Sequence, residues 1–276
     1  MGNWQGELIA QWANRGGETI LASAYVTSPW QLQRPFYPEG KDWCHIVTLH
    51  IAGGMVGGDK LTLNGQLGSG AKVCLTTATA GKIYRSLSPH LKQLNYSHWQ
   101  LDQDAILELF PQETILFSGA QFYQQLLINL HPQSLCCGWD IYRFGRTARG
   151  EEFLGGKWQS HTEVWCQNQP LWIDRQFILG TPDFLHSPNA LAGKSVLGTF
   201  WLVGQELSTD LVAILRELLA DCSATIAITR LLKGLVCRYR GNSTAECKQY
   251  FISLWQKLRP LYAHRSLCLP RVWQLK

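Results

Sequence analysis

The chain has 276 residues, of which 46% are hydrophobic and 16% are charged, and its formal net charge is +5. A chain of this length can bury a sizeable core without disulfides or a metal. The net charge is mild, no run of five like charges occurs, and no apolar stretch reaches the roughly 18 residues of a membrane span, so neither nucleic-acid binding nor a membrane location is predicted.

Short segments with alternating apolar residues predict β-strands from about residue 6 to residue 205. Each segment has the length of an ordinary strand, and turn residues separate it from the next. The pair Asn64-Gly65 is typical of a tight hairpin turn. The apolar alternation nevertheless continues on both sides of it, so a turn and a continuous strand are both compatible with this segment. The predicted strands are Ile20–Val26, Ile46–Ile51, Leu61–Leu67, Lys72–Thr77, Gln93–Leu101, Ala105–Phe110, Phe122–Leu130, Leu135–Phe144, His161–Cys166, Leu171–Leu179 and Val196–Val203.

Two helices are predicted near the C-terminus. Ser208 is a suitable N-cap for a helix over residues 209–220, which carries an apolar stripe. Ser243 and Glu246 form the capping box of a second helix, and Pro260 should lie just past its end. The strands expected between the two helices are Thr225–Leu231 and Gly234–Tyr239.

This order of elements predicts a mainly β fold. A large many-stranded β body, about residues 6–205, is followed by a small α+β element, helix–strand–strand–helix, over about residues 206–276. Because no Pro-rich or Ser-rich linker separates the two parts, we expect a single domain over residues 1–276.

The segment from residue 53 to residue 81 is rich in glycine, and Asp59 directly follows Gly57-Gly58. Glycine at this density indicates positive φ angles or close backbone contacts. The spacing matches neither a dinucleotide-binding nor a phosphate-loop signature, and we interpret it as a bend between strands. The Asp59 carboxylate then either caps a turn or meets a solute.

No permanent metal site, bound cofactor or catalytic site is predicted. Cys44, His45 and His50 are close in sequence, but the paired short spacings of a structural zinc site are absent. No nucleophile elbow or zinc-protease motif occurs, although a hydrolase site assembled from distant residues stays an alternative. The nine cysteines are scattered without a C-x-x-C pair, and the first residues do not resemble a secretory signal, so we expect reduced thiols and a cytoplasmic protein.

Several acidic residues stand at unusual places. Asp140 and Asp174 interrupt otherwise apolar strands, and Glu151 follows a glycine. In a strand such a side chain either faces solvent or points inward, where it needs a partner or water. An interior lined in this way would be wet and could carry a cation. The arginines close enough in sequence to pair with these carboxylates are Arg143, Arg146, Arg149 and Arg175.

Six segments together resemble the family of the urease accessory protein UreD, also called UreH, over nearly the whole chain. They occur in the family's order, and one departure is Gly81, where serine or alanine is more usual. The segments are RPFYPEG at 34–40, GGMVGGDKL at 53–61, LTTATAGKIYRS at 75–86, FPQETILFSGA at 110–120, DIYRFGR at 140–146 with GEEF at 150–153, and LPRVW at 269–273.

The resemblance implies a non-enzymatic chaperone of urease maturation. Members of the family form a complex with UreF and the GTPase UreG, and this complex engages apo-urease. Nickel, usually supplied by UreE, is then inserted into the urease active site in a GTP-dependent step. In that picture the ion is in transit through a polar, water-filled passage inside UreD. The alternative is a pure scaffold that bridges urease and its partners while nickel travels elsewhere.

The resemblance also implies which residues would line such a passage. Spaced carboxylates, hydroxyls and water bind Ni²⁺ weakly enough for it to leave again, as in ion channels. The C-terminal element, with its aromatic residues, is the expected main surface for UreF. The candidate residues of the nickel path are Asp59, Thr76, Thr77, Asp140, Glu151 and Asp174.

Overall fold

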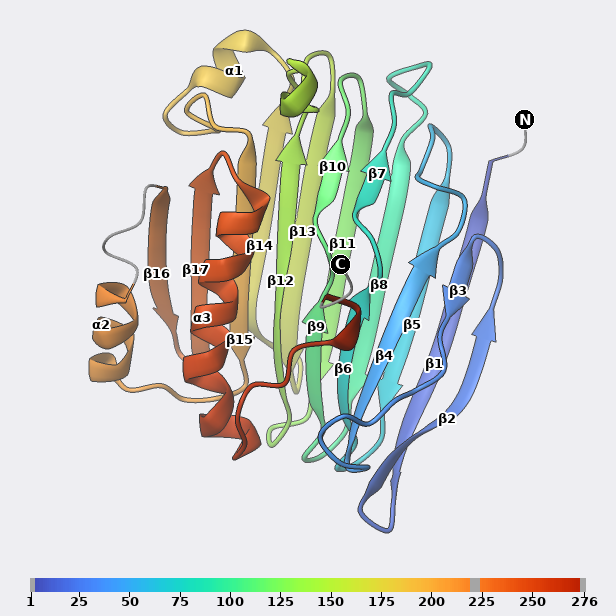
Figure 1. Cartoon of the computed structure of the whole chain (residues 1–276), viewed down its shortest axis with the longest axis vertical. Coiled ribbons are helices and arrows are strands. Elements are labelled where there is room, and N and C mark those ends of the chain that lie inside the picture. The colour runs from blue at the N-terminus through green and yellow to red at the C-terminus, as the bar shows by residue number, and fades with distance from the viewer. Residues whose placement is uncertain (1–2, 219–223, 274–276) are drawn as a thin grey trace.

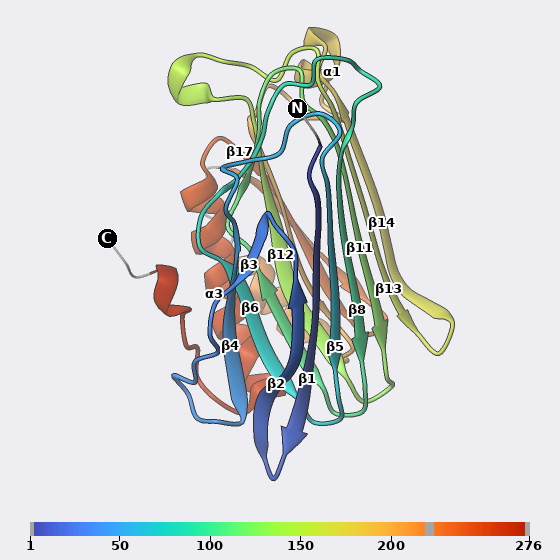
Figure 2. The ribbon, with the colours of Figure 1, turned by 90° about the vertical axis from the view of Figure 1, so that its right-hand side faces the viewer.

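The computed structural model describes residues 3–218 and 224–273. Two large sheets pack face to face, which confirms the mainly β fold (Figures 1 and 2). Sheet A has the spatial order β14 (Gln169–Leu179), β13 (Lys157–Cys166), β11 (Gln121–Leu130), β8 (Gln93–Leu101), β5 (Lys60–Leu67), β1 (Gln5–Arg15) and β2 (Glu18–Val26).

Sheet B forms the second layer and contains ten strands. The short strands β7 (Gly81–Ile83) and β10 (Thr114–Leu116) pair with each other, and β10 also pairs with β12. The remaining order is β16 (Thr225–Leu231), β17 (Gly234–Gly241), β15 (Val196–Val203), β12 (Leu135–Phe144), β9 (Ile106–Phe110), β6 (Lys72–Thr77), β4 (Trp43–His50) and β3 (Trp30–Leu32).

The chain winds between the two sheets. Leaving aside β7 and β10, each strand from β5 to β13 lies in the opposite sheet from the strand before it. Neighbours such as β5 and β8, or β6 and β9, therefore run parallel, whereas the hairpins at the edges are antiparallel. This winding brings residues far apart in the sequence to face one another across the interior.

Two apolar clusters fill opposite ends of the space between the sheets. The tryptophan-rich cluster includes Trp12, Trp99 and Trp201. The phenylalanine-rich cluster includes Phe122 on β11 and Phe144 on β12, and the other ends of these two strands contribute Ile128 and Cys136 to the first cluster. Because side chains alternate along a strand, one face of each strand contributes to this interior and the other face points outward.

The two longer helices, α2 (Thr209–Glu217) and α3 (Thr244–Ala263), pack on the outer face of sheet B. The long helix α3 lies across it, with α2 beside β16 (Figure 1). Aromatic rings form the contact, with centroids 4.2 Å apart for Phe110 and Trp255 and 4.4 Å apart for Phe110 and Trp139. The short helix α1 (Pro182–His186) packs near β14, and 3₁₀ turns occupy Thr147–Arg149 and Arg271–Trp273.

Each strand predicted from the sequence overlaps an observed strand, but β1 and the short strands β3, β7 and β10 were not predicted. Asn64-Gly65 lies inside β5 and makes no hairpin turn. Gly65 is required there because a Cβ atom would lie 2.2 Å from the ring of Trp99 on β8. The Asn-Gly pair therefore marks close packing between neighbouring strands.

The prediction that Pro260 lies past the end of the last helix is wrong, because α3 continues to Ala263. Pro260 lacks the N–H of a helical hydrogen bond. The last turn is held instead by tertiary contacts, since Arg259 and Tyr262 are buried and both bond to the carboxylate of Glu108. The other predicted helix extends to residue 217, and its expected end at residues 219–220 lies outside the described residues.

The C-terminal element is built into the β body. β17 pairs with β15 and β16 pairs with β17, so both strands extend sheet B. One cluster of buried side chains joins α2 and α3 to strands β4, β9, β12 and β15. Among the described residues, no helix has both the length and the apolar character needed to cross a membrane.

Candidate functional site

A layer of polar side chains crosses the interior between the two apolar clusters, and we call it the polar belt. On β12, Cys136 and Tyr142 belong to the interior clusters, and Trp139 and Ile141 belong to the cluster under α3. The alternation therefore turns Asp140 inward. The polar belt consists of Thr48 and His50 on β4, Thr77 on β6, Asn95 on β8, Gln124 on β11, Asp140 on β12, Asp174 on β14, Thr199 on β15 and Arg238 on β17.

Part of the polar belt lines a pocket of about 410 Å³ between the sheets. Residues of the loops around Gly53 and Ala80 line it, as do Gln124 and Asp140 on the strands. Its walls are mixed, since apolar residues such as Leu63 stand beside the hydroxyls and amides. The pocket is thus an apolar-walled space with a few polar groups at set positions.

Asp140 is the acidic residue at the inner end of this pocket. Burial raises the pKa of its carboxyl group to about 7, a hydrogen bond with Gln124 lowers it, and the charge of Asp174 raises it again. The group therefore changes charge near neutral pH. A cation that arrives in the pocket would favour the ionised form.

Asp174 and Arg238 continue the polar belt toward the edge of the sandwich. The guanidinium Nη2 of Arg238 lies 2.5 Å from Asp174 Oδ1, and its Nη1 donates to the Thr199 hydroxyl at 2.8 Å. Thr199 on β15 is the register partner of Asp140 on β12. Asp140, Thr199 and Arg238 therefore lie on three successive strands of sheet B. The partner of Asp174 is thus Arg238, not the neighbouring Arg175, which bonds to His161 on the outer face.

His50 lines the pocket, although it was not among the residues predicted for the nickel path. Burial lowers the pKa of its imidazole, whereas Asp59 raises it. Its Nε2 is buried and has no hydrogen-bond partner in the described part of the chain. A neutral imidazole with a free nitrogen is a metal ligand. Cys44 and Ile46 are buried in the interior, and His50 lies on the same face of β4. This alternation is the sequence signal that could have predicted an inward His50.

Asp59 caps a turn. Its two carboxylate oxygens accept hydrogen bonds from the backbone N–H groups of Trp4 and Val56, each at 2.8 Å, and the side chain is buried. The preceding Gly58 has φ +94°, a left-handed conformation that favours glycine. Of the two roles left open by the sequence, the geometry supports the turn cap, with the carboxylate close enough to His50 to act on its pKa.

Thr76 and Thr77 point to opposite faces of sheet B. Thr77 lines the pocket, and its hydroxyl accepts from the backbone N–H of Gln112 at 2.9 Å. Thr76 lies on the side of α3, where its hydroxyl bonds to the Phe110 carbonyl at 2.6 Å and accepts from the Trp273 indole at 3.0 Å. Only the second threonine of the pair therefore belongs to the pocket.

Glu151 holds a loop at the end of the molecule. Its carboxylate accepts from Arg146 Nε at 2.7 Å and from the backbone N–H of Ser118 at 3.0 Å. Burial alone would raise its pKa, but these hydrogen bonds and the charge of Arg146 keep it below the usual value. Of the arginines suggested by the sequence, Arg146 is the one that pairs with a candidate carboxylate.

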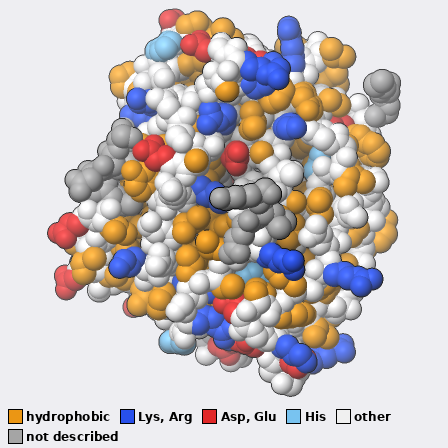
Figure 3. Space-filling view, viewed as in Figure 1, with side chains coloured by type: hydrophobic (Ala, Val, Ile, Leu, Met, Phe, Trp, Pro, Cys, Tyr) orange, Lys and Arg blue, Asp and Glu red, His pale blue; other side chains and the backbone are white. Residues whose placement is uncertain are grey.

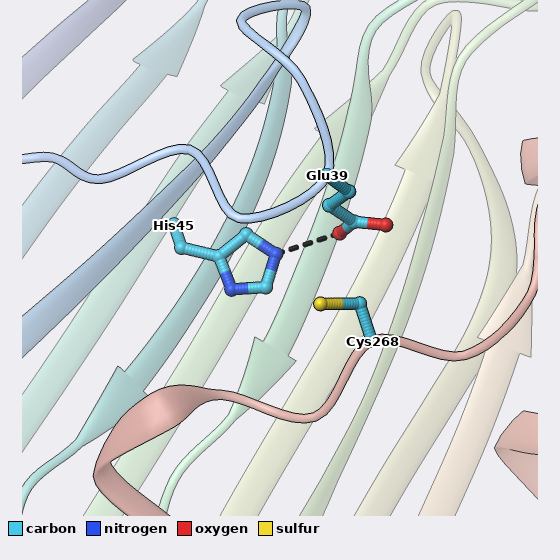
Figure 4. A group of neighbouring side chains, drawn as sticks. All are labelled: Glu39, His45 and Cys268. Carbon is cyan, nitrogen blue, oxygen red and sulfur yellow. Dashed lines mark hydrogen bonds and ion pairs between the residues drawn. The ribbon is translucent and has the colours of Figure 1, made fainter.

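A second group of side chains that can bind a metal ion lies outside the pocket. His45 points to the opposite face of β4 from Cys44 and His50, so these sequence neighbours do not form a site together. His45 instead meets Glu39 and Cys268 (Figure 4). The sequence did not indicate this group, because Cys268 lies near the C-terminal end of the chain, far in sequence from Glu39 and His45.

Comparison with known proteins identifies the family. The profile of the UreD urease accessory protein family matches residues 5–274. The urease accessory protein UreD of Acaryochloris marina is 47% identical over 100% of this chain and 97% of its own length, and that of Nostoc punctiforme is 47% identical over 99% and 96%. The UreD of Synechocystis sp. strain PCC 6803 is 39% identical over 93% and 96%. The chain therefore belongs to the UreD family of urease accessory proteins.

Proposed function

We propose that this protein is a cytosolic, non-enzymatic chaperone that assists the GTP-dependent insertion of nickel into urease, and that the ion passes along the polar belt. Family membership supports the role in urease maturation. The observation that carries the proposed path is the pocket between the sheets, which ends at an inward carboxylate that titrates near neutral pH.

The proposed partners follow from the family. They are UreF as the direct partner, the GTPase UreG, apo-urease, and UreE as the nickel donor. On the face that carries α3, basic and acidic side chains are dispersed among apolar ones (Figure 3). Such a mixed surface is typical of protein interfaces and unlike the basic stripe of a nucleic-acid-binding protein.

The ligand types along the polar belt suit an ion in transit. The pocket offers the neutral imidazole of His50, the hydroxyl of Thr77 and the carboxylate of Asp140, and Asp174 lies beyond them. Spaced donors of this kind bind Ni²⁺ without the closed cage that would retain it. Asp59, Thr76 and Glu151 are assigned to structural roles, because their polar atoms already hold backbone or side-chain partners outside the pocket.

A plug variant tests the path. Asn95 lines the pocket and faces the interior, whereas Asn64 on the neighbouring strand β5 lies on the outer face of sheet A. We expect Asn95→Phe to obstruct the pocket and to lower the nickel content of urease in a reconstitution with all accessory proteins. Asn64→Phe adds the same ring outside and should leave nickel loading unchanged.

The readout separates transport from scaffolding. Binding of the Asn95→Phe variant to UreF and to apo-urease is measured in parallel and should be normal. Normal nickel loading by a folded Asn95→Phe variant would refute the internal path and favour the pure scaffold.

A further inference from the structure

The group Glu39, His45 and Cys268 has the geometry of a small metal site. One donor atom from each side chain lies within 4.8 Å of the other two, and the three side chains converge from a loop, a strand and the segment after α3 (Figure 4). His45 Nε2 donates to Glu39 Oε1 at 2.6 Å. Atoms bound to one first-row ion at about 2.0–2.3 Å can be up to about 4.5 Å apart. The three donor atoms would therefore have to move only slightly closer together to bind one ion.

The donor types select the class of ion. Imidazole nitrogen, thiolate sulfur and carboxylate oxygen together suit borderline divalent ions such as Ni²⁺ and Zn²⁺, and they suit Mg²⁺ or Ca²⁺ poorly because these prefer oxygen. The three residues lie on the face of sheet B that α3 covers, so this group is separate from the polar belt.

The surrounding charges favour an added cation. Glu39 and Glu108 share a single guanidinium, that of Arg259, and the side chains of Glu108 and Arg259 are fully buried. The two carboxylates and the one guanidinium together have a formal charge of one negative unit. A divalent ion bound together with the Cys268 thiolate would bring the total to zero, which removes the cost of an uncompensated buried charge.

We propose that Glu39, His45 and Cys268 form a reversible binding site for Ni²⁺ or Zn²⁺, distinct from the path proposed above. On binding, Cys268 releases its thiol proton to solvent, and the proton of His45 moves from Nε2 to Nδ1 so that Nε2 can bind the ion. Arg259 keeps Glu39 in place, because its Nη1 donates to Oε2 at 2.8 Å and its Nη2 donates to Oε1 at 2.6 Å. Water or a side chain of a partner completes the coordination.

The same contacts make binding moderate and exchangeable. Nδ1 of His45 is buried and has no partner within the described ranges, whereas a firmly bound imidazole usually donates this N–H. The absence of such a partner typically weakens metal affinity by about 10–100-fold. Cys268 is only half-buried, which leaves the ion a way out.

Nickel titration of the full-length protein tests the site. Thiolate coordination of Ni²⁺ gives a near-ultraviolet charge-transfer band, and we expect this band in the wild-type protein. Cys268→Ser should abolish the band and weaken Ni²⁺ binding at least about tenfold by calorimetry. Cys166→Ser is the matched control, because Cys166 is equally half-buried but lies on β13, and it should keep the band.

Two further outcomes decide the proposal. Circular dichroism and thermal unfolding establish that each variant is folded, and competition with Zn²⁺ should remove the nickel band. An absent band in the wild-type protein, or a band that persists in Cys268→Ser, would overturn the site. The Asp140→Asn variant should keep the band, so a failure of the polar belt as a path is distinguishable from a failure of this site.

Discussion

Asp140 is the residue on which the proposed path depends, and its ionisation has a measurable consequence for stability. Because burial raises its pKa from 3.8 to about 7, the folded protein holds a proton that the unfolded chain has released. The folded state is therefore stabilised below this range and loses stability as pH rises from about 4 to about 7. The full change of pKa corresponds to at most about 4 kcal/mol.

Asp140→Asn removes this pH dependence. The stability of the variant relative to the wild-type protein should increase as pH rises from about 4 to about 7 and then level off. Urea denaturation at several pH values measures the difference. A difference that stays constant over this range would show that Asp140 ionises normally in the folded protein.

Asp59 illustrates a carboxylate whose role is structural. Asp59→Ala leaves the backbone N–H groups of Trp4 and Val56 without their acceptor, and we expect a loss of about 2 kcal/mol in the free energy of unfolding. Asp59→Asn retains one acceptor oxygen and should lose about half as much. Denaturant unfolding of both variants checks this, and equal stability of Asp59→Ala and wild type would contradict the turn-cap assignment.

At the scale of elements, α3 is fastened to sheet B by buried charges. Arg259 stacks between the rings of Trp43 and Trp255 and bonds to two carboxylates. Arg259→Met would leave these carboxylates buried without a cation, a change that typically costs about 3–5 kcal/mol. Chemical denaturation should show this loss.

Arg265→Met provides the matched control for this prediction. Arg265 also lies over Trp43, at 5.2 Å from the ring, and pairs with Asp42, but both partners are partly exposed. Such a pair contributes less than about 1 kcal/mol. If the two variants lose equal stability, the buried pair does not hold α3.

The C-terminal element remains the predicted surface for UreF, but the aromatic residues that suggested it serve the core. Phe251, Trp255 and Tyr262 are buried against sheet B. The exposed apolar side chains of this region include Ile214 on α2 and Leu218 just after it, 59% and 45% exposed, besides Leu232 and Leu261. Ile214 and Leu218 are better targets for an interface test than truncation, because truncation would uncover the core.

At the scale of the whole molecule, the winding of the chain creates the interior on which the proposed function depends. Successive strands alternate between the sheets, so the polar residues of the belt come from many strands and from both sheets. The apolar clusters at the two ends hold the sheets together without filling the middle. A central pocket is therefore compatible with a stable fold, since most of the buried apolar area lies elsewhere.

Local patterns in the sequence were sufficient for the fold class and for most strands, because alternation and turn residues act over a few positions. They also indicated that Asp140 and Asp174 could point inward. Local patterns failed where a distant contact decides the outcome, as at Pro260, where the bonds of the helix end to Glu108 outweigh a local break. The hairpin signal of Asn64-Gly65 failed for the same reason, because Trp99 of a neighbouring strand packs on the glycine.

By itself, the sequence determined the mainly β fold and, through its motifs, membership of the UreD family. Only the tertiary structure decided which polar groups meet: Thr77, His50 and Asp140 at one pocket, Asp174 with Arg238, and His45 with Glu39 and Cys268. The physical reason is that side-chain alternation is a local property with a period of two residues, whereas the pairing of strands from two sheets depends on the energy of the whole packed interior.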